Sequence, residues 1–121
     1  MLIAIRTDAS DRIGTGHVIR CLALADVLRE RGDEVCFVCR RHSGHLIGLI
    51  EDRGYRTLPL ESPEREASTA GEDYRACLGV PPETDALNTM ASLGDARLDW
   101  LIVDHYALDR AWEQALRNHT S

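Results

Sequence analysis

Short apolar runs alternate with segments of helical periodicity along most of this chain. Residues 2–6 form the first run, and residues 17–31 then carry apolar side chains at the spacing of a helix that packs on one face. Residues 34–40 form a second run, and Gly32 stands before it, where a glycine commonly ends a helix. Strands that alternate with helices are typical of βαβ units, which build parallel sheets with right-handed crossovers. This alternation predicts an α/β fold.

The same alternation continues toward the end of the chain. Residues 61–71 are polar and predict a surface loop, residues 71–80 predict a short helix, and one domain accounts for all 121 residues. We predict a Rossmann-like three-layer domain over residues 1–121, with a parallel sheet of about four strands. The remaining predicted elements are a short helix over residues 44–54, a weaker strand over 55–60 with Pro59 at a sheet edge, a helix over 83–94 from the spacing of Leu87, Met90 and Leu93, a strand over 100–103 and a helix over 108–118.

The charge and hydropathy of the chain exclude several classes of protein. Its net charge is −6, whereas non-specific nucleic-acid binding needs a basic surface. No apolar run approaches the roughly 20 residues that span a bilayer, and residues 1–8 become polar too soon for a signal peptide. With 44% hydrophobic and 28% charged residues, the composition is that of a globular protein. We therefore expect a cytoplasmic protein that binds neither nucleic acid nor membrane.

The four cysteines are expected to be reduced and structural. Cys36 and Cys39 form a C-x-x-C pattern inside an apolar run, where residues three apart point to opposite faces of a strand. Their thiols are therefore unsuited to share a metal ion, and a redox C-x-x-C normally lies at the start of a helix. Cys21 falls on a predicted helix and Cys77 stands alone. Since the sequence also has no Asp-x-Asp pattern and no His/Cys cluster, we expect no metal and no cofactor.

The segment IGTGHVIRC, residues 13–21, lies where the first strand passes into the first helix. Gly14 and Gly16 match the first two glycines of a dinucleotide-binding G-x-G-x-x-G, but Ile19 takes the third position, where a side chain obstructs helix–strand packing. No G-K-[ST] follows, so the segment is not a P-loop. The second strand ends in Arg40 and Arg41, which suit a 2′-phosphate, so NADP stays open without being supported.

His17 lies in the first turn of the predicted helix. There the positive end of the helix dipole favours the neutral imidazole, which is able to act as a general base. Arg20, one turn later on the same face, is placed to meet a substrate oxygen or phosphate. The alternative for His17 is a structural role at the helix start.

Further candidates follow the first and last strands, whose carboxyl ends lie at the edge of a parallel sheet where ligands bind. Asp8 either orients His17, binds sugar hydroxyls or fixes its loop by an Asx-turn. Asp104 and His105 either form an acid–base pair, or Asp104 caps the next segment. Tyr106 either offers its hydroxyl to a ligand or buries its ring. Three other histidines follow no ligand spacing and are expected at the solvated surface: His42, His45 and His119.

Three blocks of the sequence together resemble a known family. They are residues 5–32 (IRTDASDRIGTGHVIRCLALADVLRERG), residues 35–40 (VCFVCR) and residues 99–113 (DWLIVDHYALDRAWE). The blocks are similar to the N-terminal half of the bacterial UDP-2,4-diacetamido-2,4,6-trideoxy-β-L-altropyranose hydrolases, the nucleotide-sugar hydrolases of the pseudaminic acid pathway. The G-x-G-H-x-x-R-C and D-H-Y motifs are specific in combination, whereas residues 61–94 match only loosely.

The resemblance implies a GT-B-like enzyme, in which two Rossmann-like domains face each other across a cleft. The implied reaction is metal-independent hydrolysis, with inversion, of the bond between the anomeric carbon and UDP. The general base implied by the resemblance is His17, and Tyr106 belongs to the implied substrate site. We expect the other substrate contacts to come from Asp8, Gly14, Gly16, Arg20, Asp104 and His105.

Members of that family continue into a C-terminal domain that holds UDP. We therefore expect this chain alone to be nearly inactive, and to self-associate through apolar surface that further elements would cover. Two other functions stay open. One is a glycosyltransferase of the same architecture, in which His17 deprotonates an acceptor hydroxyl, and the other is a non-catalytic nucleotide-binding module of Rossmann type.

Overall fold

The computed structural model describes residues 1–62, 78–105 and 107–117, which form an α/β domain of Rossmann-like type. Its sheet has four strands in the order β3-β2-β1-β4, and every neighbouring pair is parallel. The strands are β1 (Leu2–Thr7), β2 (Glu34–Arg40), β3 (Arg56–Leu60) and β4 (Trp100–Asp104). The helices between and after them are α1 (Gly16–Glu30), α2 (Ile47–Asp52), α4 (Pro82–Leu93) and α5 (Arg110–Leu116). The predicted fold class is confirmed.

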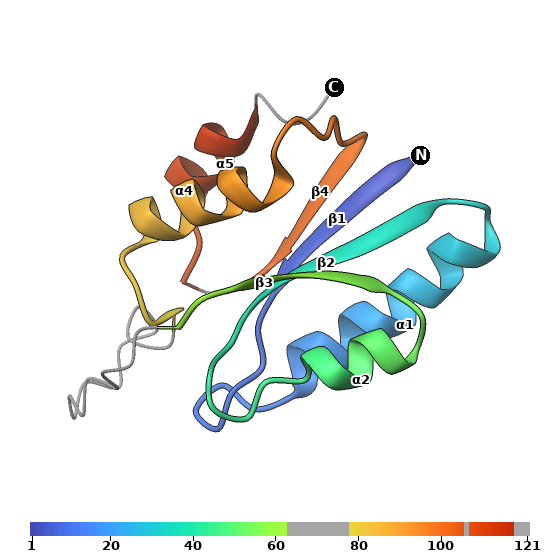
Figure 1. Ribbon diagram of the computed structural model, residues 1–121, viewed down its shortest axis with the longest axis horizontal. Coiled ribbons are helices and arrows are strands. Elements are labelled where there is room, and N and C mark those ends of the chain that lie inside the picture. The colour runs from blue at the N-terminus through green and yellow to red at the C-terminus, as the bar shows by residue number, and fades with distance from the viewer. Residues whose placement is uncertain (63–77, 106, 118–121) are drawn as a thin grey trace.

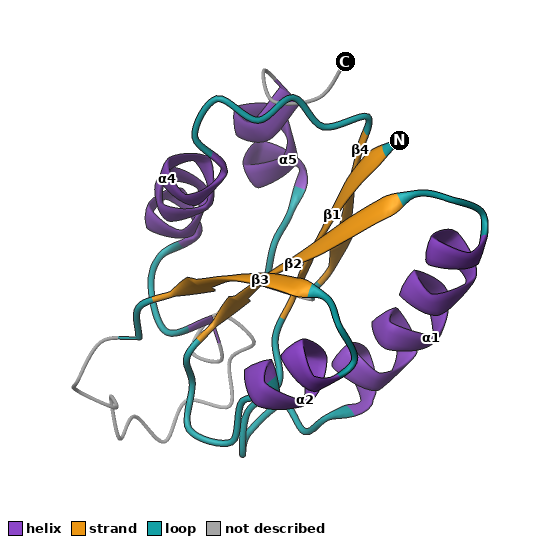
Figure 2. Cartoon of the chain, turned by 45° about the vertical axis from the view of Figure 1, so that its right-hand side comes forward, coloured by secondary structure: helices purple, strands orange, loops and turns teal. Residues whose placement is uncertain are grey.

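The helices cover both faces of the sheet, which gives three layers (Figures 1 and 2). Helices α1 and α2 pack on one face, around a core that includes Ile5, Leu22 and Phe37. Helices α4 and α5 pack on the other face, around a core that includes Val38 and Trp112. Because β1 and β2 are covered on both sides, their side chains are buried whichever way they point.

The two cysteines of the C-x-x-C pattern lie on opposite faces of β2, as predicted. Cys39 belongs to the core under α1, and Cys36 belongs to the core under α4 and α5. Both thiols are free, and burial raises the pKa of each above its ordinary value. They act as small core residues.

The ends of the elements follow local backbone chemistry. Gly32 and Gly54 adopt positive φ angles of 91° and 90° just after α1 and α2, and Pro59 lies in the edge strand β3. Helix α2 is shorter than predicted, because Gly44 (φ 86°) belongs to a turn before it. Most of the predicted 61–71 loop and 71–80 helix falls outside the described residues.

Helix α4 forms where its apolar spacing predicts, yet its buried face is partly polar. Leu87 is 63% exposed, while Asp85 and Thr89 are fully buried against the sheet. Among the described residues, no helix has the length and apolar character needed to span a bilayer.

Candidate functional site

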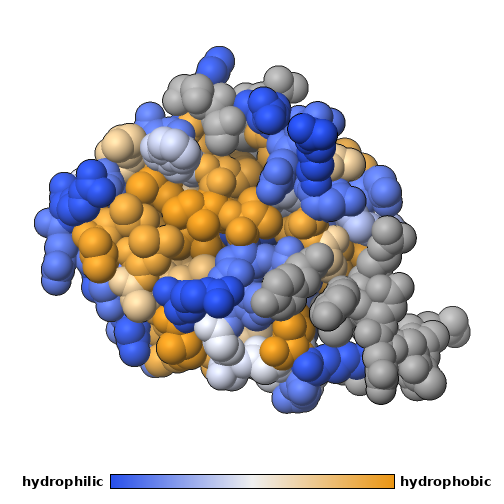
Figure 3. Space-filling model, turned by 180° about the vertical axis from the view of Figure 1, so that it is seen from behind, coloured by the Kyte–Doolittle hydropathy of each residue, from blue (hydrophilic) through white to orange (hydrophobic). Residues whose placement is uncertain are grey.

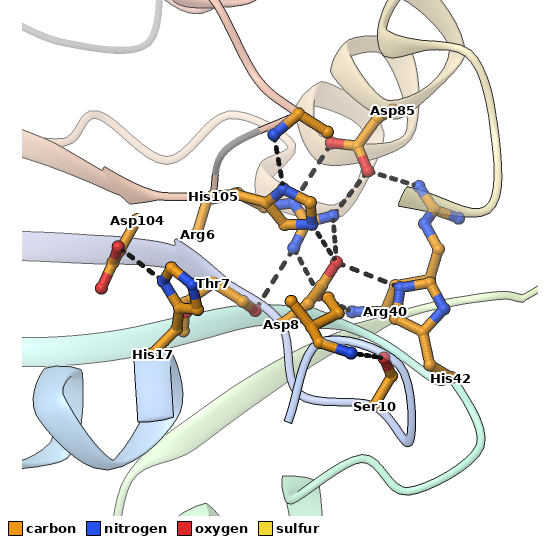
Figure 4. Close-up of polar contacts among 12 residues, drawn as sticks. Arg6, Thr7, Asp8, Ser10, His17, Arg40, His42, Asp85, Asp104 and His105 are labelled. Atoms are coloured by element: carbon orange, nitrogen blue, oxygen red, sulfur yellow. Dashed lines mark hydrogen bonds and ion pairs between the residues drawn. The ribbon is translucent and has the colours of Figure 1, made fainter. Parts of the chain in front are cut away.

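The two sequence motifs meet at the carboxyl edge of the sheet. Strand register places Thr7, the last residue of β1, beside Asp104, the last residue of β4. The loop after β1 leads into α1, so the start of that helix lies at the same edge (Figure 4). This is the edge at which open parallel sheets bind ligands.

The loop between β1 and α1 is held by its own hydrogen bonds. Gly14 N–H donates to Ser10 O over 2.8 Å, and the Ser10 hydroxyl accepts from the backbone N–H groups of Arg12 and Ile13. Gly14 needs its lack of a side chain, because its φ is 79°. Gly16 is the first residue of α1, and no side chain caps this end of the helix. The loop thus fixes His17 in the first helical turn.

Asp104 connects the two motifs. Its Oδ1 lies 2.9 Å from Nδ1 of His17 and 2.7 Å from Nη2 of Arg20. Its Oδ2 accepts from Nε and Nη2 of Arg20, at 3.1 and 2.8 Å, and from the Cys21 thiol. Burial alone would raise the pKa of Asp104, but the hydrogen bonds from Arg20, His17 and Cys21 outweigh it and hold that pKa below its ordinary value. Asp104 is therefore a carboxylate at neutral pH.

The contact with Asp104 determines how the His17 ring can act. A neutral imidazole that donates its Nδ1 proton to a carboxylate carries its lone pair on Nε2. An imidazole oriented in this way is suited to take a proton at Nε2. Cys21 is no competing nucleophile, because burial and the charge of Asp104 raise its thiol pKa to about 12.

A second polar group lies beside the first and is almost completely buried (Figure 4). Arg6 Nη1 donates to Asp8 Oδ1 over 2.6 Å, and its Nη2 donates to Asp85 Oδ2 over 2.6 Å. Arg40 Nη2 donates to the same Asp85 oxygen over 2.8 Å. Two arginines and two aspartates therefore compensate each other's charge inside the domain, as buried ions require.

Asp8 is the centre of this buried group. Besides Arg6, it accepts from the backbone N–H of Arg40 and lies 3.2 Å from His42 Nε2. Burial alone would raise its pKa, but the Arg6 charge and the contacts of His105, His42 and Arg6 with the carboxylate hold the pKa well below its ordinary value. The contact that orients His17 comes from Asp104 and not from Asp8, whose side chain is fully buried.

His105 also contributes to the buried group rather than to an acid–base pair with Asp104. Its Nδ1 accepts from the backbone N–H of Ala107 over 3.1 Å, so the proton of the neutral ring lies on Nε2. That Nε2 is 3.1 Å from Asp8 Oδ2, although not in hydrogen-bond geometry. The side chains of Asp104 and His105 leave the chain in different directions, so Asp104 contacts His17 while His105 faces Asp8.

The expectations for His42 and Arg40 need revision. His42 is buried beside Asp8 and not solvated, because a turn in which its N–H donates to Arg40 O brings its ring to that carboxylate. Arg40 is held by Asp85, Asn88 and Glu61, so it is not available for a 2′-phosphate. Tyr106 lies outside the described residues.

Sequence reasoning missed the buried group as a unit. Its members come from β1, β2, α4 and the segments after β1, β2 and β4, and only Asp8 and His105 stood out in motifs. One signal was present: Arg6 interrupts an apolar strand two residues before Asp8, and a charge inside a buried strand requires a partner. Within residues 1–62, 78–105 and 107–117, no group of three or more His, Cys, Asp or Glu side chains is arranged to hold a metal ion.

Fold and site together define a Rossmann-like α/β domain with a His–Asp–Arg cluster at the carboxyl edge of its sheet. A scan against protein-family models finds no match, and a search of curated proteins finds no significant match. Support for a function therefore comes from the geometry of the site and the resemblance of its motifs.

Proposed function

We propose that this chain is the N-terminal domain of a metal-independent nucleotide-sugar hydrolase. The proposed enzyme works in the bacterial cytoplasm and releases UDP from UDP-2,4-diacetamido-2,4,6-trideoxy-β-L-altropyranose in pseudaminic acid biosynthesis. The substrate comes from the motif resemblance alone. The structural observation that supports the chemistry is the 2.9 Å contact between His17 Nδ1 and the Asp104 carboxylate.

In the proposed reaction, His17 Nε2 takes a proton from a water molecule as the water oxygen bonds to the anomeric carbon. The bond from that carbon to the β-phosphate oxygen breaks, and its electron pair leaves on UDP. Asp104 orients the imidazole and stabilises the imidazolium that forms. Attack opposite the leaving group inverts the anomeric centre. Arg20, whose Nη2 lies 3.3 Å from His17 Nδ1, is placed to meet a phosphate oxygen.

The first test measures UDP release from the nucleotide sugar, with no acceptor sugar present. The chain is assayed alone and together with a UDP-binding domain of the kind that the resemblance implies. We expect the pair to hydrolyse the substrate and the chain alone to be nearly inactive, because closure over the substrate orients the anomeric carbon and excludes bulk water. Brisk hydrolysis by the chain alone contradicts the two-domain proposal.

The second test removes the base. In the assembled two-domain enzyme, His17→Asn should lower turnover by about 10²–10⁴-fold, the usual contribution of a general base, with substrate binding retained. His45→Asn is the matched control, because His45 is exposed on the loop before α2. Near-normal turnover of His17→Asn contradicts the role of His17 as the base and indicates a structural role at the helix start. UDP release only with an acceptor sugar indicates a glycosyltransferase, and tight NADP binding without turnover indicates a non-catalytic module.

A further inference from the structure

Two donors converge on one oxygen of Asp104. Both His17 Nδ1, at 2.9 Å, and Arg20 Nη2, at 2.7 Å, contact Oδ1. The same Arg20 nitrogen lies 3.3 Å from His17 Nδ1. Among the described residues, the Cys21 thiol on α1 and Thr7 at the end of β1 also lie at this cluster. His17, Arg20 and Asp104 therefore form one coupled unit.

This arrangement is compatible with two tautomers of the neutral His17 ring. If Nδ1 carries the proton, it donates to Asp104, and Nε2 has the lone pair. If Nδ1 is unprotonated, it accepts from Arg20, which is always a donor, and the proton then sits on Nε2. Only the first tautomer accepts a proton at Nε2. In the second tautomer the Nδ1 lone pair faces Asp104 Oδ1 at 2.9 Å, so the first tautomer is the favoured one. Arg20 at its present place weakens that preference, because it shares Oδ1 with His17 and lies within donating distance of Nδ1.

Arg20 is also the member of the unit that is able to move. Its side chain is 65% exposed, against 20% for Asp104 and 12% for His17. Water screens the charge of a side chain as exposed as Arg20, so Arg20 is able to exchange one anionic partner for another. A phosphate or diphosphate offers the guanidinium a two-pronged, charge-assisted contact of the same kind as the carboxylate.

We propose that Arg20 is a ligand-responsive switch for His17: it exchanges Asp104 for the phosphate oxygens of an incoming ligand, and the released carboxylate then holds His17 in the Nδ1–H tautomer. The ligand class, a diphosphate ester, rests on the proposed function. The switch makes the base competent when the leaving group is bound and less competent when it is not. A ligand acts in this way because it binds one arrangement of the unit better than the other.

Long-range ¹H–¹⁵N NMR spectra of the labelled chain test the switch, because they distinguish the two tautomers of a histidine ring. The His17 signals are assigned by their loss in His17→Asn. The probe is inorganic pyrophosphate, compared with sodium chloride at equal ionic strength, at a pH where the ring is neutral. In the native chain we expect pyrophosphate to shift Nδ1 toward a protonated nitrogen and Nε2 toward an unprotonated one.

Two variants make the expectation specific. Arg20→Gln should show the Nδ1–H tautomer without pyrophosphate and should no longer respond to it. Arg31→Gln, which changes an exposed arginine just after α1, should respond like the native chain. Circular dichroism establishes that both variants fold. The switch is refuted if pyrophosphate leaves the His17 signals unchanged, or if Arg20→Gln has the tautomer and the response of the native chain.

These outcomes are separate from those of the hydrolase test. A tautomer shift with no UDP release from the nucleotide sugar keeps the switch and rejects the proposed reaction. UDP release by the assembled enzyme, with no tautomer shift and with Arg20→Gln fully active, keeps the reaction and rejects the switch.

Discussion

At the scale of single residues, the domain depends on charges that it has removed from water. Arg6, Asp8 and Asp85 have fully buried side chains, and each charge is opposed by another within hydrogen-bond distance. Such a group adds little net stability compared with an apolar core, but the loss of one member leaves an uncompensated buried charge. Its value lies in position, because it joins the ends of β1 and β2 to α4 beside the His17 cluster.

Asp8→Asn tests the cost of this group and its pH dependence. The folded state depresses the Asp8 pKa, so the carboxylate stabilises the fold above the unfolded pKa of about 3.9, and that contribution is lost as pH falls through the lower folded value. Asp8→Asn should lower the free energy of unfolding at pH 7 by about 3–5 kcal/mol. The variant should also lose less stability than the native chain between pH 5 and pH 2.

Urea unfolding at several pH values measures both effects. Asp95→Asn is the control, because Asp95 is exposed after α4. An Asp8→Asn variant as stable as the native chain at pH 7 shows that the buried group repacks without this charge.

At the scale of elements, two loops at the carboxyl edge support each other. The backbone N–H of Asp11, after β1, donates to Ser43 O, after β2, over 2.8 Å. The Ser43 hydroxyl donates in return to the Asp11 carboxylate over 2.9 Å. Gly44 allows this approach, because a Cβ there would lie 2.8 Å from the backbone nitrogen of Asp11. The loop that carries His17 is thus positioned by a neighbouring loop as well as by its own turn.

Gly44→Ala and Gly32→Ala form a matched pair for this contact. Both glycines have φ near 90° (86° and 91°), so each substitution pays a backbone penalty of roughly 1–2 kcal/mol. Only Gly44→Ala meets neighbouring atoms, since nothing lies within 4 Å of a Cβ at Gly32. We expect thermal or urea unfolding to find Gly44→Ala clearly less stable than Gly32→Ala. Equal losses of stability in the two variants mean that the contact between the Asp11 and Ser43 loops does not stabilise the fold.

At the scale of the whole molecule, the β4 edge of the sheet exposes apolar surface. Strand β4 ends the sheet opposite β3, and Trp100 on it is 60% exposed. Figure 3, seen from behind the view of Figure 1, shows apolar side chains gathered across this side of the domain. Exposed Ile19, Leu24 and Val27 on α1 add further apolar surface. Edges and patches of this kind favour association.

We therefore predict that the isolated chain self-associates as its concentration rises, and that Trp100→Lys weakens the association. Leu87→Lys is the control, since Leu87 is equally exposed (63%) but lies on α4, away from the β4 edge. Sedimentation velocity over a range of concentrations measures the effect. A clean monomer at high concentration, or an equal response to both substitutions, contradicts the prediction.

Local sequence was sufficient for the elements and their order. Apolar periodicity places each described strand and helix within a few residues, because the side-chain period of a helix or a strand is a property of its own backbone. Glycines at positive φ end the helices where they were expected, for the same local reason. The parallel sheet follows from the alternation and the handedness of its crossovers, and the sheet brings the G-x-G-H and D-H-Y motifs to one edge.

The partners of the polar side chains required the tertiary structure. His17 and Asp104 are 87 positions apart, and Arg6 and Asp85 are 79 apart, so no local pattern links them. Asp8, Asp104 and His105 are all polar residues at strand ends, yet one is buried with Arg6, one holds His17 and one faces Asp8. Strand register and the packing of α4 determine these pairings, because a side chain's partner depends on which element covers its face of the sheet.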